Sequence, residues 1–530
     1  MIKRRKLRSQ ASQQPSGNSV SPLGTDLKAN LQRMKQSMGH SNDLVVREFR
    51  IGYVQGDAAI VYIDNLVDKK MIGEFVLRST MSGAAGSESN ASERDIDVLD
   101  TIKNRILPLG EASIAKEWNE LFSAVLNGDT AILVSGYAGA IIVSTHGGEH
   151  RSVEEPSSEV LIRGPKEGFT ESIATNISLV RRRLKTRNLW MDGFKIGNVT
   201  QTNVGILYIK GIAGDKTVEE VKRRLNGIET DGVLESGIIE EFIRDHPFSL
   251  FPTLDNTERP DSVAAGLLEG QVAILIDGTP FVLLAPTTFF MFFQSPEDHY
   301  HNFQFAIFIR TLRFVAFMIS LLGPSIYVAA ISFHQEMIPT SLLLSLAAQR
   351  EGVPFPALIE AFLMEASFEI LREAGVRMPR AIGQAVSIVG AIVLGQAAVQ
   401  AGIVSSAMVI VVSLTGIASF TMPAYNMGIS IRMLRFMLMI SAGLFGFFGI
   451  ALGGLIITAH LCSIRSFGIP FMSPFAPFIA ADQKDTLLRL PRWFLNTRPR
   501  LISQENTTRM NGSKPVPPGE AAEEGSPDEN

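Results

Sequence analysis

The sequence contains very little cysteine and comparatively little charge, and both shortages narrow the class of protein. Cys462 is the only cysteine among 530 residues, so no disulfide can form within the chain, which fits a reducing compartment. Charged residues make up 19% of the chain, below the roughly 25% of ordinary soluble domains. The net charge of −4 does not imply a nucleic-acid partner, so we expect none.

The sequence also lacks the short motifs that mark common chemistries. It has no GxxxxGK[ST] phosphate loop, no CxxC pair, no HExxH zinc motif and no DxDxDG calcium loop. The eight histidines show no metal-ligand spacing apart from the weak pair His299-x-His301. The sequence therefore predicts no catalytic residues, no cofactor, no metal site and no enzymatic activity.

Long uncharged stretches stand out against these absences. Residues 314–333, 381–431 and 436–464 carry no charged side chain. About 20 apolar residues in a helix span the roughly 30 Å hydrocarbon core of a bilayer. These stretches predict an α-helical polytopic membrane domain, which we place at residues 298–480.

The stretch 381–431 is too long for one span, because as a single helix it would measure about 77 Å. It has to fold back, most plausibly near Ala401-Gly402. We therefore expect four spans, at about 311–335, 381–400, 403–422 and 436–462. Gly446, Gly449 and Gly453 allow close helix packing in the last span, either within one chain or between subunits.

The segment at 354–374 is too acidic to span, and its pattern predicts an amphipathic helix at the membrane surface. Glu365 and Glu369 share one face of this helix, with Glu360 nearby. In a symmetric oligomer they could form a ring of carboxylates around a cation pore. The alternative is that they face water or pair with Arg372 and Arg377.

Apart from Arg313 near the start of the first, the predicted spans contain no charged side chain, which argues against a proton-coupled carrier. Gln384 and Gln396 are the polar candidates for a pore lining. Gln396 could instead hydrogen-bond to a neighbouring helix.

The region before the membrane domain repeats itself. The stretch LNGDTAILVSGYAGAIIV at residues 126–143 matches LEGQVAILIDGTPFVLLA at residues 268–285, and both read as hairpins with a glycine-containing turn. An earlier strand pattern, FRIGYVQGDAAIVYID at residues 49–64, returns as FKIGNVTQTNVGILYIK at residues 194–210. We therefore predict a cytosolic α/β region of two similar subdomains, 43–160 and 193–297.

A connecting helix is expected between the subdomains, at 161–192, with a run of basic residues near its C-terminal end. Positive charge there suits the helix dipole, although a phosphate or headgroup site is the alternative. Residues 1–42 and the tail from about 503, within a cytosolic segment 481–530, have the composition of disordered chain. The first residues are basic but are not followed by the apolar stretch of a secretory signal peptide, so we expect the N-terminal region to remain in the cytoplasm.

The charge distribution around the spans does not settle their orientation. Placing both ends inside puts Arg350, Arg372 and Arg377 outside, against the positive-inside tendency. The alternative is a re-entrant first hairpin, which would instead place the basic C-terminal segment outside. We retain four spans with both ends inside.

Three blocks of sequence resemble the A subunit of the GerA-type nutrient germinant receptors of endospore-forming bacteria. The first block is RGPKEGFTESIATNISLVRRRLKT, from residue 163. The second is ERPDSVAAGLLEGQVAILIDGTPFVLLAPTTFFMFFQSPEDHY, from residue 258. The third starts at residue 351 with EGVPFPALIEAFLMEASFEILREAGVRMPRAIGQ. The resemblance covers about residues 43–497.

The resemblance implies a multi-pass protein of the inner spore membrane with a cytosolic N-terminal domain. It also implies two partner subunits, a B-type subunit similar to amino-acid transporters and a C-type lipoprotein, and a homo-oligomer that acts as a ligand-gated cation channel. The alternative function is a membrane-anchored signalling scaffold that does not itself conduct ions.

Overall fold

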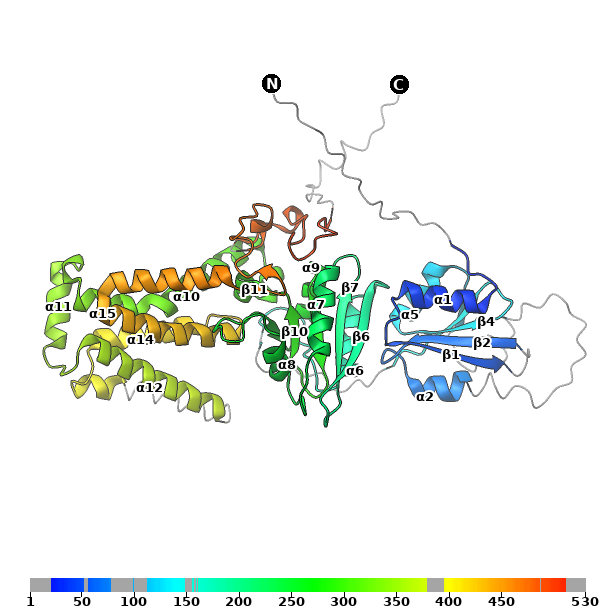
Figure 1. The fold of residues 1–530 in the computed structure, drawn as a ribbon, viewed down its shortest axis with the longest axis horizontal. Helices are drawn as coiled ribbons and strands as arrows, with labels where there is room; N and C mark the ends of the chain where they lie inside the picture. The colour runs from blue at the N-terminus through cyan, green and yellow to red at the C-terminus, as the bar shows by residue number, and fades with distance from the viewer. Residues whose placement is uncertain are drawn as a thin grey trace, which may run out of the picture. The chain divides into compact units, whose positions relative to one another are not determined.

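A computed structural model gives the fold of the chain, which divides into two compact units. The first comprises residues 1–151 and 177–191, and the second comprises residues 152–176 and 192–530. Figure 1 labels the elements of each unit. The structure describes residues 21–51, 56–77, 99, 112–147, 155–156, 159, 161–378, 395–486 and 488–510.

The first unit is built on a five-stranded antiparallel sheet in the order β1-β2-β4-β5-β3. The strands are β1 (Leu44–Ile51), β2 (Gly56–Ile63), β3 (Ala112–Ala115), β4 (Thr130–Val134) and β5 (Ala140–Val143). Strands β4 and β5 are buried along their whole length. Both faces of the sheet are covered, one by α1 (Leu27–Ser37) and α5 (Trp118–Asn127), and the other by α2 (Lys69–Met71) and the π-helix Ile72–Leu77.

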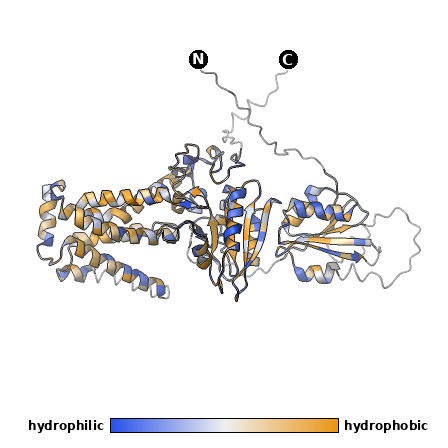
Figure 2. Cartoon of the chain, viewed as in Figure 1, coloured by the Kyte–Doolittle hydropathy of each residue, from blue (hydrophilic) through white to orange (hydrophobic). Residues whose placement is uncertain are grey.

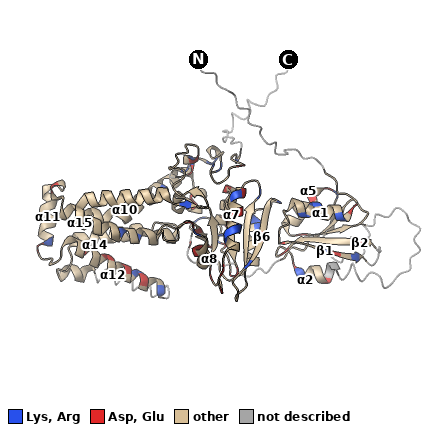
Figure 3. Ribbon diagram, viewed as in Figure 1, with Lys and Arg blue, Asp and Glu red and all other residues tan. Residues whose placement is uncertain are grey.

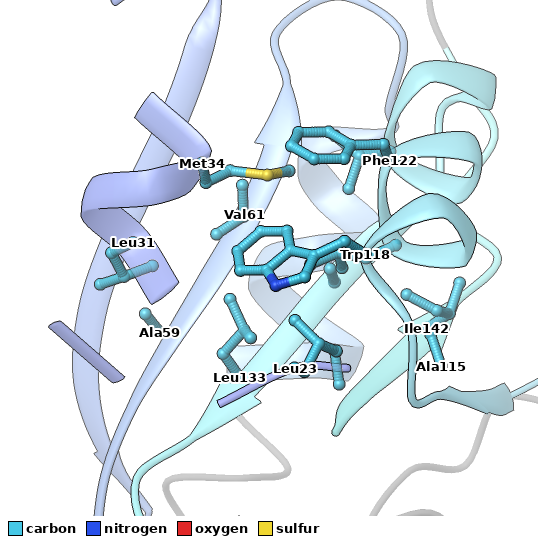
Figure 4. Packing of buried hydrophobic residues seen from close by; sticks show 14 of the residues in the cluster. Leu23, Leu31, Met34, Ala59, Val61, Ala115, Trp118, Phe122, Leu133 and Ile142 are labelled. Carbon is cyan, nitrogen blue, oxygen red and sulfur yellow. The ribbon is translucent and has the colours of Figure 1, made fainter. Parts of the chain in front are cut away.

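Helix α1 corrects the prediction of disorder over 1–42 for residues 21–42, and residues 1–20 lie outside the described residues. Asp26 caps its N-terminus by accepting hydrogen bonds from the backbone of Lys28 and Ala29. Its apolar side chains recur at helical spacing, and Leu31 and Met34 are buried in the same core as Trp118 (Figure 4). The polar composition of the segment concealed this narrow apolar stripe.

The second unit contains a five-stranded sheet with the equivalent order, β6-β7-β9-β10-β8. Its strands are β6 (Leu189–Ile196), β7 (Thr202–Ile209), β8 (Asp255–Thr257), β9 (Val272–Ile276) and β10 (Val282–Ala285). Helices α7 (Asp215–Asn226), α8 (Ser236–Ile243) and α9 (Pro260–Glu269) accompany it. The matching strand orders confirm two similar α/β subdomains.

Glycines explain why the two hairpin sequences are so similar. Helix α5 ends at Gly128 and α9 ends at Gly270, and these residues have φ of 101° and 98°. Residues with side chains rarely adopt this left-handed conformation, so glycine is the favoured helix terminator. Each glycine stops a helix and turns the chain directly into a buried strand, β4 or β9.

The predicted connecting segment contains helix α6 (Ile173–Arg183). Its basic residue Arg181 is buried and makes an ion pair with Asp43, with Nε 2.6 Å from Oδ2. Arg181 also donates a hydrogen bond to Ser41. This arginine is therefore committed to a structural ion pair, and it is not available as a phosphate ligand.

An apolar helical bundle completes the second unit. It contains α10 (Phe303–Ser332), α11 (Thr340–Arg350), α12 (Ala357–Arg377), α14 (Ser406–Ser419) and α15 (Tyr425–Ser463). Within the described ranges, α10 and α15 are long and apolar enough to cross a membrane, and Figure 2 shows the hydrophobic colouring of this bundle. Most of the span predicted at 381–400 lies outside the described residues.

Helix α15 corrects the prediction of a single span at 436–462. Gly446 has φ 61° and ψ −141°, which interrupts the helix. A Cβ added at Gly449 would lie 2.1 Å from the backbone oxygen of Ser441, and one added at Gly453 would lie 2.6 Å from Leu438. The chain therefore reverses at Gly446 into a tight helical hairpin with arms 425–445 and 447–463, and the glycines pack within one chain.

Phenylalanine side chains join the second subdomain to the bundle. Phe289, Phe292 and Phe293 follow the sheet and are buried against Phe317 of α10 and against the first arm of α15. The same cluster takes in Phe471, which lies beyond α15. Because this core is continuous, the second subdomain and the bundle fold as one unit.

An ion network lies at the start of α10. Asp298 receives hydrogen bonds from Arg310 and Arg313, and Arg310 also contacts Asp485, with Nη1 2.9 Å from Oδ1. Burial raises the pKa of Asp298, but the hydrogen bonds from Arg313 and the charge of Arg310 outweigh burial and lower the pKa below its usual value.

The C-terminal segment after α15 packs back onto the second subdomain. Ser466 donates to the backbone oxygen of Thr253, and Arg498 donates to that of Leu268. Ser503 is buried, and the described chain continues to residue 510. The prediction of disorder from about residue 503 is therefore wrong for 503–510, because the Arg498 side chain holds this stretch by donating hydrogen bonds to Asn506 Oδ1 and to the backbone oxygen of Thr508.

Candidate functional site: a buried ion network between α12 and α15

Helix α12 turns its glutamate face toward the interior of the bundle. It begins directly after Pro356, whose ring fixes the backbone conformation needed at a helix start. Glu360 and Glu365 are both fully buried, whereas Ile359, Leu363 and Ile370 are exposed. The predicted amphipathic helix therefore buries two of its glutamates and exposes several of its apolar side chains.

The inward orientation is possible because arginines on α15 neutralise the glutamates. Arg435 is fully buried and approaches Glu365, with Nη2 3.0 Å from Oε2. Glu369 bridges two arginines, at 2.8 Å from Arg432 and 3.2 Å from Arg435. A buried charge is tolerated only when it is paired, so α12 and α15 depend on each other for their positions.

A second contact holds the other end of α12. Glu360 accepts hydrogen bonds from the backbone and side chain of Ser405, the N-cap residue of α14. Arg350, the last residue of α11, lies 3.7 Å from the carboxylate of Glu360. This carboxylate therefore connects α11, α12 and α14.

The structure brings together only some of the candidate pore residues. Glu360, Glu365 and Glu369 lie on the inner face of α12, and the first two have no exposed surface. Within the described chain, Glu365 and Glu369 contact Arg432 and Arg435 of α15, whereas the partners expected from the sequence were Arg372 and Arg377. Gln396 is exposed and separate from the ion network, and Gln384 lies outside the described residues.

Sequence reasoning missed the arginine partners. Arg432 and Arg435 precede the uncharged stretch 436–464, so they lie outside the predicted last span and are not among the predicted site residues. Arg432 and Arg435 are three residues apart, and Glu365 and Glu369 are four residues apart. Either spacing places two side chains on the same face of a helix, so the two pairs can face each other. A charged pair is thus buried inside the bundle beside the uncharged stretches, and Figure 3 marks the acidic and basic residues along α12.

Two similar α/β subdomains and an apolar bundle with internal ion pairs define a protein with globular α/β domains and a membrane-type helical domain. The family model "Bacillus/Clostridium GerA spore germination protein" matches residues 32–501. The chain therefore belongs to the GerA family of spore germination proteins, and its role lies in spore germination.

Similarity to known relatives extends over nearly the whole chain. Spore germination protein KA of Bacillus subtilis (strain 168) is 50% identical over 489 residues, which is 92% of this chain and 89% of that protein. The uncharacterized membrane protein YfkQ of the same organism is 45% identical over 490 residues, 92% of this chain and 94% of that protein.

A solved structure also matches, the N-terminal domain of the A subunit of the Bacillus megaterium spore germinant receptor GerK3. It is 42% identical, covers 51% of this chain and 98% of that chain, and has a TM-score of 0.41.

Proposed function

We propose that this chain is the A subunit of a nutrient germinant receptor in the inner spore membrane, and that it oligomerises into a ligand-gated cation channel. The observation that carries the proposal is the family match over residues 32–501, which includes both subdomains and the helical bundle. The relatives that align with 86–92% of this chain include the Bacillus subtilis spore germination proteins KA, B1 and A1.

The junction between the second subdomain and the bundle supports a receptor that transmits a signal. The phenylalanine cluster and the Asp298 network connect the sheet to α10 through buried contacts. Ser430, near the start of α15, donates a hydrogen bond to the backbone oxygen of Leu250. A shift of the subdomain would therefore act directly on α10 and α15, and two discrete arrangements of such packed elements are what coupling requires.

The proposed assembly contains a transporter-like B-type subunit and a C-type lipoprotein, with the α/β head in the cytosol. Exposed apolar side chains on α10, α12 and α14 support a bundle surrounded by lipid and by other subunits, because such surfaces are unfavourable in water. Ile326, Ile370 and Ile410 are examples.

One observation favours the scaffold as a second candidate. The network around Glu365 and Arg435 is internal, and the outer faces of the described helices α12 and α14 are mainly apolar. A bundle of this kind could anchor the head and bind partners without lining a pore.

Reconstitution separates the two functions. The full chain, co-purified with its two partner subunits, is placed in potassium-loaded liposomes, and potassium release is recorded when nutrients are added. A channel releases potassium only in the presence of nutrient, whereas a scaffold assembles the same complex and releases none.

The variant Glu369→Gln should reduce the release, because it weakens the contact between α12 and Arg432 while leaving the Glu365–Arg435 pair intact. Glu373→Gln is the matched control, since Glu373 is exposed and pairs only with Arg377 on its own helix in the described structure. Equal potassium release from both variants would contradict a gating role for the network.

A further inference from the structure

Arg372 is the cation of the α12–α15 network that lacks a carboxylate partner. No described carboxylate lies within ion-pair distance of it, although Arg377, five residues later, pairs with Glu373. Its guanidinium carbon lies over the ring of Phe420, 4.8 Å from the centroid. Its Nη1 atom is buried without a hydrogen-bond partner.

The surrounding charges do not balance. Three arginines and two glutamates interact here, so the cluster has a net charge of +1. Its members are Arg372, Arg432, Arg435, Glu365 and Glu369. Arg435 is fully buried, yet its Nε and Nη1 atoms also lack hydrogen-bond partners. Unsatisfied buried donors with excess positive charge favour an additional anion.

The position of the cluster in the bundle indicates which anion is available. Arg435 immediately precedes the uncharged stretch 436–464, and Ser430, one turn earlier, contacts the second subdomain at Leu250. In a membrane, the end of an uncharged stretch lies at the level of the lipid headgroups. The cluster therefore lies where phosphates of the leaflet nearest the second subdomain are expected.

An exposed apolar stripe leads away from Arg372 along α14. Ile410, Leu414, Ile417 and Phe420 are 68%, 52%, 65% and 62% exposed, and their spacing places them on one helix face. This stripe has the length and chemistry to contact an acyl chain, and it ends at the aromatic ring beneath the guanidinium.

We propose that Arg372, supported by Arg432 and Arg435, binds the phosphodiester headgroup of an anionic phospholipid whose acyl chains lie along α14. The headgroup supplies the missing negative charge and accepts hydrogen bonds from the unsatisfied guanidinium donors. The interaction is independent of ion conduction, so it holds for a channel and for a scaffold.

The test uses the full chain in nanodiscs that contain equal amounts of phosphatidylglycerol and phosphatidylcholine. After transfer to detergent, lipids that remain bound are counted by native mass spectrometry. We expect retained phosphatidylglycerol to exceed phosphatidylcholine by about fivefold, which is the effect of one basic side chain near a membrane surface. The variant Arg372→Gln should abolish the preference.

Arg377→Gln is the matched control, because it removes the same charge from the same helix at an exposed position already paired with Glu373. Arg372→Lys keeps the positive charge, so it should retain a weaker preference and also serves if Arg372→Gln fails to fold. Equal loss of the preference in Arg377→Gln and Arg372→Gln would overturn the proposal.

Two further outcomes also count against a lipid site. Retention of phosphatidylcholine equal to that of phosphatidylglycerol in the unaltered chain would show that charge plays no part. Thermal stabilisation by millimolar inorganic phosphate, with no additional stabilisation by phosphatidylglycerol, would identify a free-phosphate site instead.

Discussion

Replacing Glu365 by Gln tests whether the ion network determines how α12 packs on α15. Glu365 and Arg435 are both fully buried, and removing one partner of a buried pair costs about 3–5 kcal/mol. Glu369 remains 3.2 Å from Arg435 and compensates part of the charge, so we expect about 3 kcal/mol for Glu365→Gln.

Arg435→Met should be more harmful than Glu365→Gln. Arg435 is the only described cation within ion-pair distance of Glu365, so its removal leaves that carboxylate buried and uncompensated, at a cost of about 5 kcal/mol. The double variant Glu365→Gln/Arg435→Met removes both charges and should be within about 1 kcal/mol of the unaltered chain. The double-mutant cycle should therefore give a coupling energy of several kcal/mol.

These differences in unfolding free energy are measured by titrating the detergent-purified chain with SDS. The loss of helix is followed by far-UV circular dichroism. Glu373→Gln is the control, because its exposed pair with Arg377 should contribute at most about 1 kcal/mol. If Glu365→Gln is no more destabilised than Glu373→Gln, or if the double variant shows the sum of both single losses, the pairing argument is wrong.

Three further substitutions test other parts of the fold by thermal or pH-dependent unfolding. Gly446→Ala should cost about 1–3 kcal/mol, because its φ of 61° and ψ of −141° suit only glycine, whereas Gly454→Ala, where an added Cβ meets nothing within 4 Å, should not destabilise. Asp298 has a pKa held below its unfolded value of 3.8, so the stability that it contributes is present above pH 3.8 and is lost as the pH falls below it. Asp298→Asn should remove this loss of stability at acid pH, and an unchanged dependence of stability on pH would contradict the assignment. Arg181→Met should destabilise the first unit by about 3–5 kcal/mol because Asp43 stays buried, and a loss below 1 kcal/mol would refute this.

The sequence was sufficient to predict the duplicated α/β region, because buried strands and glycine-terminated helices leave a local pattern. Gly128 and Gly270 each end a helix in the left-handed conformation directly before a buried strand. Such features depend on residues close together in the sequence, and the same pattern occurs in both subdomains. The N-terminal helix α1 was missed because its stability comes from tertiary contacts with Trp118, and tertiary packing commonly overrides a weak local preference.

The candidate site was only half predictable. The spacing of Glu365 and Glu369 correctly placed them on one face of α12, but a helix pattern alone does not say whether that face meets water or another helix. The deciding information was Arg435, which lies 70 residues further along the chain. Its pairing with Glu365 depends on the three-dimensional arrangement of α12 and α15.

The reversal of α15 was hidden for a related reason. Hydropathy recognises an apolar stretch but does not distinguish a straight span from two shorter arms, since both are uncharged. The distinguishing residue is Gly446, and glycine is also common in straight membrane helices. Only the close approach of Gly449 to Ser441 identifies the hairpin.

The buried contacts together make α15 the element through which the second subdomain and α12 would influence each other. Ser430, on its first arm, is bonded to the subdomain at Leu250, and Arg435, little more than one turn later, is paired with Glu365 of α12. A rotation of this arm large enough to break the first contact would also displace the second, because both lie on the same rigid helix segment. The free energy that resists such a rotation is largely the cost of separating a buried ion pair, so a state in which the subdomain has moved requires another partner for Arg435.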